Sequence, residues 1–181
     1  NTYSSPKSFN NHFGVPISLS NLSIDDRYGV FEVGMSRAGE IKKLTKLIKP
    51  HIGIITNIGE AHIENFTNID EIAKAKAEII ENITENGTII LNRDDKFFKY
   101  LCKKAKSKKL KIITFGKDKK SDIFPLRIIK SKDLVKIFIK VKNQKINLVF
   151  KNLNIHNVLA SLAVIKELNL NLYNVKKIFK N

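Results

Sequence analysis

Short apolar runs alternate with segments of helical periodicity between residues 28 and 116, and this alternation restricts the fold more than any other feature of the chain. Runs rich in β-branched residues predict strands, whereas apolar residues three and four positions apart predict helices. Strands are predicted at residues 28–33, 51–58, 88–91 and 111–115, and helices at residues 40–48, 69–84 and 97–108. This alternation is typical of a parallel sheet covered by helices. We therefore expect an α/β fold with a doubly wound, mostly parallel sheet flanked by helices.

The pattern changes after residue 116, where strand follows strand and lysine alternates with apolar residues. Such alternation predicts one buried and one solvated face, which is typical of antiparallel pairing. The strands are predicted at residues 122–129, 134–141 and 145–150. We therefore expect a small antiparallel sheet near residues 122–150, with helices after it at residues 157–168 and 175–179.

Residues 1–22 are rich in turn-forming residues and show no strong period. Neither an internal repeat nor a long linker divides the chain, and 181 residues are about the length of one domain. We expect a single domain over residues 1–181.

The chain is strongly basic, with 33 Lys and Arg against 17 Asp and Glu and a formal net charge of +16. Such a balance invites a nucleic-acid-binding module. However, arginine, which reads phosphates and bases better than lysine, occurs only at positions 27, 37, 93 and 127. Lys, Asn and Ile are frequent together, which indicates a compositional drift. We expect a lysine-coated, solvated surface and no nucleic-acid partner, and the nucleic-acid-binding module is the alternative.

Cys102 is the single cysteine, so the chain forms no internal disulfide, which fits a reducing compartment. No apolar run reaches the roughly 18 residues that a membrane helix needs, and the first residues do not resemble a signal peptide. We expect no membrane span.

Polar side chains follow two of the predicted strands where those strands end. Glu32 closes the first run, and Asn57 and His62 come at and after the end of the next. Ligands of open parallel sheets bind beyond the carboxyl ends of the strands, so we expect these residues to share one edge of the sheet. The alternatives are that Glu32 caps a helix and that His62 is a loop histidine bonded to water.

Lys76 lies near the apolar face of the helix predicted at residues 69–84, whereas Lys74 points away from it. A lysine drawn into a partly apolar site has a lowered pKa and can act as a neutral nucleophile. The alternative is a lysine whose aliphatic stem covers apolar surface while its charge reaches water.

Two further polar groups stand at predicted boundaries. His156 and Asn157 open the last long helix, where they are either ligands or capping residues. Asn92 begins the segment Asn-Arg-Asp-Asp after a strand, where a binding role and a plain turn are equally good interpretations. The chain has no GxxxxGK[ST] phosphate loop, zinc-spaced Cys/His cluster or nucleophile elbow. The residues alone therefore predict a metal- or phosphate-handling site at one sheet edge.

Six stretches carry a family resemblance that spans nearly the whole chain. They are NNHFGVPISL (10–19), FEVGMSRAGEIKKL (31–44), PHIGIITNIGEAHIENF (50–66), IAKAKAEI (72–79), LNRDD (91–95) and IHNVLASLAV (155–164). In this order they resemble the Mur ligases of peptidoglycan synthesis. The branch that adds a diamino acid typically has Ser-Ser-His where this chain has Gly34-Met35-Ser36, so the chain is more similar to the branch that adds D-alanyl-D-alanine.

The resemblance implies an ATP-dependent amide ligase of bacterial cell-wall synthesis, cytoplasmic and monomeric. The carboxylate of UDP-N-acetylmuramoyl-tripeptide would take the γ-phosphoryl group of ATP, and the amine of D-alanyl-D-alanine would then attack the acyl phosphate. Two Mg²⁺ ions are implied as cofactors. The alternative within this class is a Mur or folylpolyglutamate-type ligase that adds a different amino acid.

The resemblance also implies roles for individual residues. Glu32 would serve a metal that bridges the ATP phosphates, His62 would hold the second metal, and Lys76 would be a carbamylated lysine whose new carboxylate suits Mg²⁺. These three form the implied catalytic and metal set. The implied ATP-binding residues are Asn11, Asn92, His156 and Asn157, and the implied substrate-binding residues are Asn10, Asn11, Arg37, Glu40 and Asn57.

The chain departs from the family pattern in two ways. Asn154 and Ala160 stand where the family usually has Gly and a second Asn near the adenine, so the adenine contact differs. The family's phosphate loop lies upstream of the Asn-Asn motif, and a further domain follows the middle one. We therefore expect residues 1–181 to be the middle, ATP-binding domain, truncated at its N-terminus and without the C-terminal domain, and inactive alone.

Overall fold

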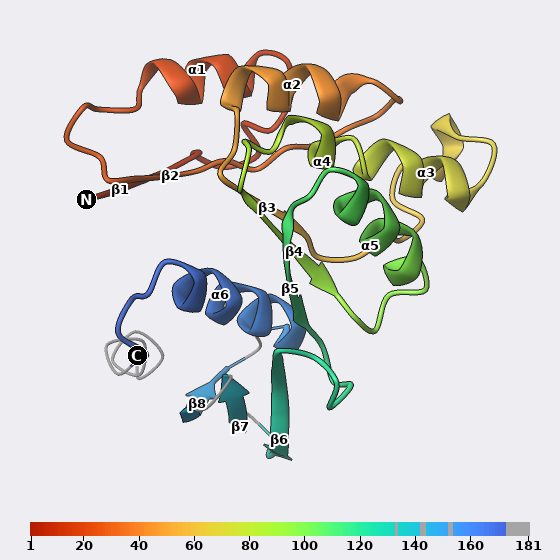
Figure 1. Ribbon diagram of the computed structural model, residues 1–181. Helices are drawn as coiled ribbons and strands as arrows, with labels where there is room; N and C mark the ends of the chain where they lie inside the picture. The colour runs from red at the N-terminus through yellow and green to blue at the C-terminus, as the bar shows by residue number, and fades with distance from the viewer. Residues whose placement is uncertain (133, 142–143, 152–153, 173–181) are drawn as a thin grey trace. The chain divides into compact units, whose positions relative to one another are not determined.

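A computed structural model describes residues 1–132, 134–141, 144–151 and 154–172 (Figure 1). The chain divides into two compact units. The first, here called the N-terminal unit, comprises residues 1–51 and 58–87. The second, here called the sheet unit, comprises residues 52–57 and 88–181. The helix predicted at residues 175–179 lies outside the described residues.

The N-terminal unit is mostly helical. Its elements are β1 (Thr2–Ser4), α1 (Gly14–Ser20), β2 (Tyr28–Val30), α2 (Glu40–Ile48), the 3-10 turn η1 (Ile63–Asn65), α3 (Ile69–Lys76) and α4 (Ile79–Asn82). The strands β1 and β2 pair in parallel, with Tyr3 opposite Gly29. Both β1 and α1 lie within residues 1–22, where the sequence shows no strong period.

Helix α2 has the bounds that its periodicity predicted. Ile41 and Leu44 face inward and are buried. The helix ends where Lys49 adopts a left-handed conformation with φ of 48°, and Pro50 follows. Proline is common just after a helix end because it cannot continue the helix.

The helix predicted at residues 69–84 is interrupted. α3 ends at Lys76 and α4 begins at Ile79, although Ala77 and Glu78 keep right-handed helical dihedral angles. Here Glu78 N donates to Ala75 O and Ile80 N donates to Ala77 O, the i to i−3 pattern of a 3-10 turn. The prediction was therefore right that this segment is helical, and wrong that it forms one continuous helix.

Among the described residues, the sheet unit holds one sheet of six strands with two helices. Its elements are β3 (Ile52–Ile55), β4 (Thr88–Asn92), α5 (Phe98–Ser107), β5 (Lys111–Phe115), β6 (Ile123–Lys130), β7 (Val135–Val141), β8 (Gln144–Phe150) and α6 (Ile155–Glu167). The strands stand in chain order; β3 to β6 pair in parallel, and β6, β7 and β8 pair antiparallel. The helices α5 and α6 lie on opposite sides of β4 and β5 (Figure 1).

This architecture confirms the predicted α/β class, with two differences. The antiparallel strands continue the parallel sheet, because Phe115 of β5 pairs with Ile123 of β6. In addition, β2 pairs with β1 in a sheet of its own and is not part of the six-stranded sheet. The expectation that Glu32 and His62 follow successive strands of one sheet was therefore wrong.

The core of the sheet unit lies between α6 and the sheet. Leu159 and Leu162 of α6 are fully buried against a cluster that includes Ile137 and Ile139 of β7. Burying such a side chain contributes about 1.5–3 kcal/mol, so these contacts anchor the start of α6 firmly on the sheet. None of the helices in the described part of the chain is long and apolar enough to span a membrane.

Candidate functional site

In the N-terminal unit the structure brings together two of the predicted site residues, Asn10 and Glu32. Asn10 Nδ2 donates a hydrogen bond to Glu32 Oε1 over 2.7 Å, and Gly34 N donates to Asn10 O over 2.8 Å. Gly34 favours this approach, because a Cβ there would lie 3.0 Å from the Asn10 side-chain amide and would push that amide aside. The Glu32 carboxylate is thus exposed, and Asn10 orients one of its two oxygens.

Asn11, the next residue, lies in the turn that leads into α1. Its Oδ1 accepts hydrogen bonds from Phe13 N at 3.1 Å and Gly14 N at 2.9 Å, and its backbone oxygen accepts from Val15 N. These bonds satisfy backbone donors that have no partner inside the helix. Any ligand role of Asn11 therefore falls on its amide nitrogen.

Glu40 turns back onto the loop that precedes α2. Its Oε2 accepts hydrogen bonds from Ser36 N at 2.6 Å and Arg37 N at 3.1 Å. The Ser36 N–H is the largest influence on the Glu40 carboxyl and, with the N–H and charge of Arg37, holds its pKa below the usual value. The carboxylate predicted to bind substrate thus shapes its own loop, and the Arg37 side chain on that loop is exposed.

Glu78 is a carboxylate that the sequence analysis did not single out. Its Oε1 accepts from Gly39 N at 2.6 Å and its Oε2 from Lys42 N at 3.0 Å, so it caps the N-terminus of α2. A negative charge at a helix N-terminus is favourable for the helix dipole. Gly39 and Lys42 precede Glu78 by 39 and 36 residues, and no local sequence pattern reveals contacts over such separations.

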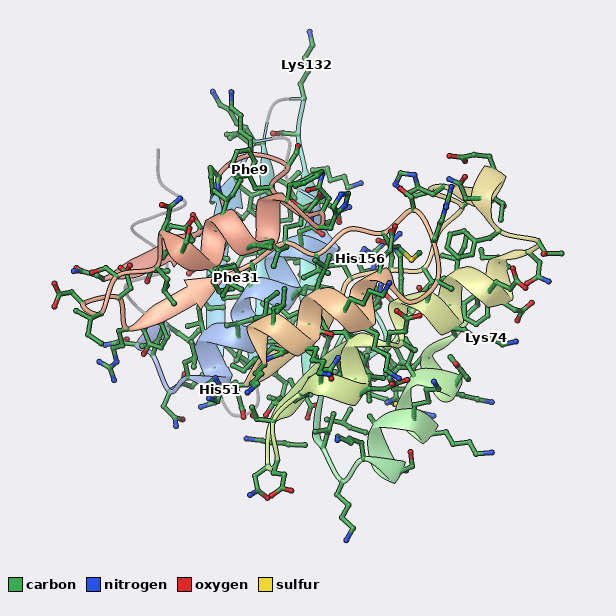
Figure 2. All side chains as sticks on the ribbon, turned by 90° about the horizontal axis from the view of Figure 1, so that it is seen from above. Phe9, Phe31, His51, Lys74, Lys132 and His156 are labelled. Carbon is green, nitrogen blue, oxygen red and sulfur yellow. The ribbon has the colours of Figure 1, made fainter. Side chains whose placement is uncertain are left out.

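His62 and Lys76 lie at two turns of the same unit. His62 is exposed and has φ of 63°, the left-handed region in which histidine is enriched among non-glycine residues. Its Nδ1 is 3.8 Å from Glu64 Oε1. Lys76 is half-buried at the end of α3, whereas Lys74 is exposed and extends outward (Figure 2). The predicted difference between the two lysines is confirmed.

Mg²⁺ usually keeps several waters and is held by one or two carboxylates together with substrate phosphates. Within the described ranges, no three His, Cys, Asp or Glu side chains gather into a metal site. An exposed carboxylate such as Glu32, already oriented by a neutral amide, fits an ion that shares its ligands with a phosphate. Lys76 fits only if it gains a carboxylate.

In the sheet unit, Asn92 joins two strand ends. It is 7% exposed; its Nδ2 donates to Thr56 O at 2.9 Å and its Oδ1 accepts from Asp94 N at 3.0 Å. Both ends of this side chain are thus engaged in holding the turn after β4 beside the end of β3. Asn57, next to Thr56, is exposed, and its Oδ1 accepts from Thr56 Oγ1 at 3.3 Å.

At the start of α6 the capping residue is Asn154, so the capping alternative for His156 and Asn157 does not hold. Asn154 Oδ1 accepts from His156 N at 2.8 Å. Asparagine at position 154 therefore has a structural explanation, because its side chain caps α6. Asn157 is exposed in the first turn, and the ring of His156 contacts Asp94, which the sequence analysis had treated as part of a turn.

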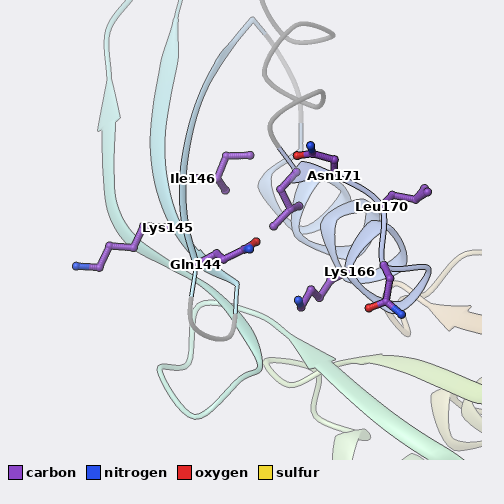
Figure 3. Close-up of a pocket in the computed structure, with 8 residues that line it drawn as sticks. Gln144, Lys145, Ile146, Lys166, Leu170 and Asn171 are labelled. Carbon is purple, nitrogen blue, oxygen red and sulfur yellow. The ribbon is translucent and has the colours of Figure 1, made fainter.

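The sheet unit also has a hollow of about 570 Å³ (Figure 3). It is lined by Gln144, Lys145, Ile146, Lys166, Asn169, Leu170, Asn171 and Leu172. None of these is a predicted site residue.

A family model described as the Mur ligase middle domain matches residues 1–165. The chain belongs to this family. The UDP-N-acetylmuramoyl-tripeptide–D-alanyl-D-alanine ligase of Rickettsia prowazekii is 37% identical over 120 residues, which are 66% of this chain and 27% of that protein. The ligase of the same name from Buchnera aphidicola (subspecies Baizongia pistaciae) is 34% identical over 163 residues, 90% of this chain and 35% of that protein.

Solved structures agree with this membership of the Mur ligase family. A crystal structure of MurF from Acinetobacter baumannii superposes with a TM-score of 0.91 at 29% identity, over 99% of this chain and 40% of that one. MurF from Thermotoga maritima, crystallised with ADP, shares the fold with a TM-score of 0.82 at 24% identity, over 94% of this chain and 40% of that one. The chain thus spans between 27% and 40% of the length of these relatives.

Proposed function

We propose that this chain is the nucleotide-handling part of an ATP-dependent ligase that joins D-alanyl-D-alanine to UDP-N-acetylmuramoyl-tripeptide. The observation that carries the proposal is the match over 90% of the chain to a relative named for that reaction. The Asn10–Glu32 contact supports it, because it lies within the NNHFGVP and FEVG stretches that carried the resemblance. The protein would work as a monomer in the bacterial cytoplasm and bind no nucleic acid.

The reaction has two steps. A carboxylate oxygen of the tripeptide attacks the γ-phosphorus of ATP, and ADP leaves. The amine of D-alanyl-D-alanine then attacks the acyl carbon, and inorganic phosphate leaves as the amide forms. When bound, two Mg²⁺ ions would neutralise the negative charge that gathers on the phosphates and on the acyl phosphate.

The residues of the N-terminal unit would hold these ions and orient the acceptor. Glu32, oriented by Asn10, would offer a carboxylate oxygen to the first ion, and His62 would hold the second. Arg37 and Asn11, with Asn10, would bind the substrate. The structure favours a supporting role for Glu40, since its carboxylate already receives two backbone N–H groups.

Lys76 would join the second ion as a carbamate. The neutral Nζ amine adds to CO₂, a C–N bond forms, and one proton is released to water, which leaves an anionic carboxylate. The position of Lys76 supports this step, because its side chain is half-buried at the end of α3 whereas that of Lys74 is exposed.

In the sheet unit, His156 and Asn157 would contact the nucleotide beside Asn57, beyond the carboxyl ends of parallel strands where such ligands bind. Asn92 would act indirectly, because both ends of its amide hold the turn at this edge.

The test is phosphate release by the intact protein with ATP and UDP-N-acetylmuramoyl-tripeptide, with a panel of amines. Release with D-alanyl-D-alanine, together with a product of the matching mass, is expected. Glu32→Gln should lose this activity, and Glu85→Gln, a matched change at an exposed glutamate, should keep it. Release only with glutamate, lysine or diaminopimelate and their own acceptors would contradict the proposed substrate. Salt-sensitive, tight binding to duplex DNA without ligase activity would instead favour a nucleic-acid-binding module.

A further inference from the structure

Asp94 collects three hydrogen bonds at one edge of the sheet unit. Its Oδ2 accepts from Lys117 N at 2.7 Å and from His156 Nε2 at 2.9 Å, and its Oδ1 accepts from Asp118 N at 3.1 Å. The carboxylate thereby ties together the turn after β4, the loop after β5 and the start of α6. Asp94 takes no direct part in the two steps of the proposed reaction.

The approach of Asp94 to the loop depends on Gly116. This glycine has φ of +154°, and a Cβ there would lie 2.8 Å from an Asp94 carboxylate oxygen. From the other side, Asn92 accepts the Asp94 N–H and holds the turn on the end of β3. The position of the Asp94 carboxylate is therefore set by backbone groups from several elements, independently of its hydrogen bond with His156.

His156 is held by its backbone as well as by its ring. Its N–H donates to Asn154, and its side chain keeps 27% of its surface exposed, against 26% for Asp94. Within the described part of the chain, the hydrogen bond to Asp94 is the one that the ring makes. With Nε2 turned to the carboxylate, Nδ1 is the ring nitrogen available to a ligand.

We propose that Asp94 is a positioning residue that fixes the His156 ring, so that Nδ1 accepts a hydrogen bond from the nucleoside part of a bound nucleotide. The ligand class rests on the proposed function, since the proposed reaction consumes ATP. An imidazole that donates its Nε2 proton to a carboxylate presents its other nitrogen as a hydrogen-bond acceptor. A ribose hydroxyl or an adenine amine can donate to it. A phosphate cannot, and the nearby Asp94 charge would repel one.

The positioning role is tested by NMR on the intact protein without nucleotide. A ring N–H that is hydrogen-bonded to a carboxylate exchanges slowly with water, so a His156 Nε2–H signal is expected, and His156→Gln assigns it. Asp94→Asn and Asp94→Ala should abolish the signal. Asp95→Asn, the same charge change one residue away, should retain it, since Asp95 Oδ1 accepts from Phe97 N. Persistence of the signal in Asp94→Ala would overturn the proposal.

The ligand class is tested by titration of adenosine, ADP and pyrophosphate at pH 8. Loss of one oriented hydrogen bond weakens binding roughly two- to tenfold. Asp94→Asn should weaken the binding of adenosine and of ADP by the same factor and leave the affinity for pyrophosphate unchanged. If the substitution weakened the binding of pyrophosphate and left the affinity for adenosine unchanged, the assignment of a nucleoside contact would be overturned. If wild type binds no adenine nucleotide while the ring signal still depends on Asp94, the proposed function and the nucleoside contact fail, and the positioning role stands.

Discussion

The amide nitrogen of Asn10 lies 2.7 Å from a carboxylate oxygen of Glu32, 22 residues further along the chain. A neutral donor in this place orients the carboxylate without cancelling its charge, which a lysine or arginine would do. The carboxylate therefore remains a full anion for a metal while losing part of its rotational freedom.

Asn10→Asp should impair the ligase more than Asn10→Ala does. The alanine removes an orienting hydrogen bond, whereas the aspartate places a second negative charge beside Glu32 and favours protonation of one of the two. Phosphate release measured against Mg²⁺ concentration should show a raised Mg²⁺ requirement for both variants, larger for Asn10→Asp. Asn147→Asp, the same change at an exposed position of β8, is the control. An unchanged Mg²⁺ dependence in Asn10→Asp would separate Asn10 from the metal site.

Glu78→Ala should destabilise the fold by about 1–3 kcal/mol, because two backbone N–H groups at the start of α2 lose a charged acceptor. The matched control is Glu81→Ala, three residues further along the chain. In the wild type the Glu81 carboxylate pairs with Lys42 on the surface, where 41% of the Glu81 side chain and 60% of the Lys42 side chain are exposed. Such an exposed pair contributes little to stability because solvent screens it. Urea unfolding measures both free energies of unfolding, and a smaller loss in Glu78→Ala than in Glu81→Ala would contradict the capping role.

Asp94 predicts a pH dependence of stability. Burial, the largest single influence, raises the pKa of its carboxyl, but the hydrogen bonds from Lys117 N, His156 and Asp118 N together outweigh burial and lower the pKa below its ordinary 3.8. A depressed folded-state pKa stabilises the fold above the unfolded pKa, and this contribution disappears as the pH falls through the folded value.

The free energy of unfolding of Asp94→Asn should therefore lie furthest below that of wild type near pH 6, and the gap should narrow as the pH falls below about 3.8. Ile139→Val, a core change without a titrating group, should show a deficit of about 0.5–1.5 kcal/mol that does not vary with pH. Urea unfolding at several pH values checks both. A gap for Asp94→Asn that widens on acidification would show that the Asp94 pKa is not depressed.

Local patterns predicted much of this fold because they report on local physics. The bounds of α2 follow from apolar spacing and from Pro50, and the different exposure of Lys74 and Lys76 follows from helical geometry. Asn154 caps α6 through an ordinary side-chain hydrogen bond, whereas capping by His156 or Asn157 had been one of two open alternatives.

The contacts that shape the candidate site join residues far apart in the chain, and no periodicity encodes them. Glu78 reaches Gly39 and Asp94 reaches His156, across 39 and 62 positions. The pairing of β2 with β1 was missed for a related reason: a strand as short as Thr2–Ser4 carries too few residues to show an alternation.

Lys76→Ala should lower the ligase rate by at least roughly ten- to a hundredfold, whereas Lys74→Ala should leave it unchanged. The two lysines lie two residues apart in α3, and only Lys76 is drawn toward the apolar face, so the pair separates a specific role from a general loss of positive charge. If Lys76 acts as a carbamate, activity should fall when CO₂ is removed from the buffer and return with bicarbonate, and added short-chain carboxylates should partly restore Lys76→Ala. Full activity in CO₂-free buffer together with inactivity of Lys76→Ala would mean that the amine itself is the functional group, and equal loss in both alanine variants would remove Lys76 from the site.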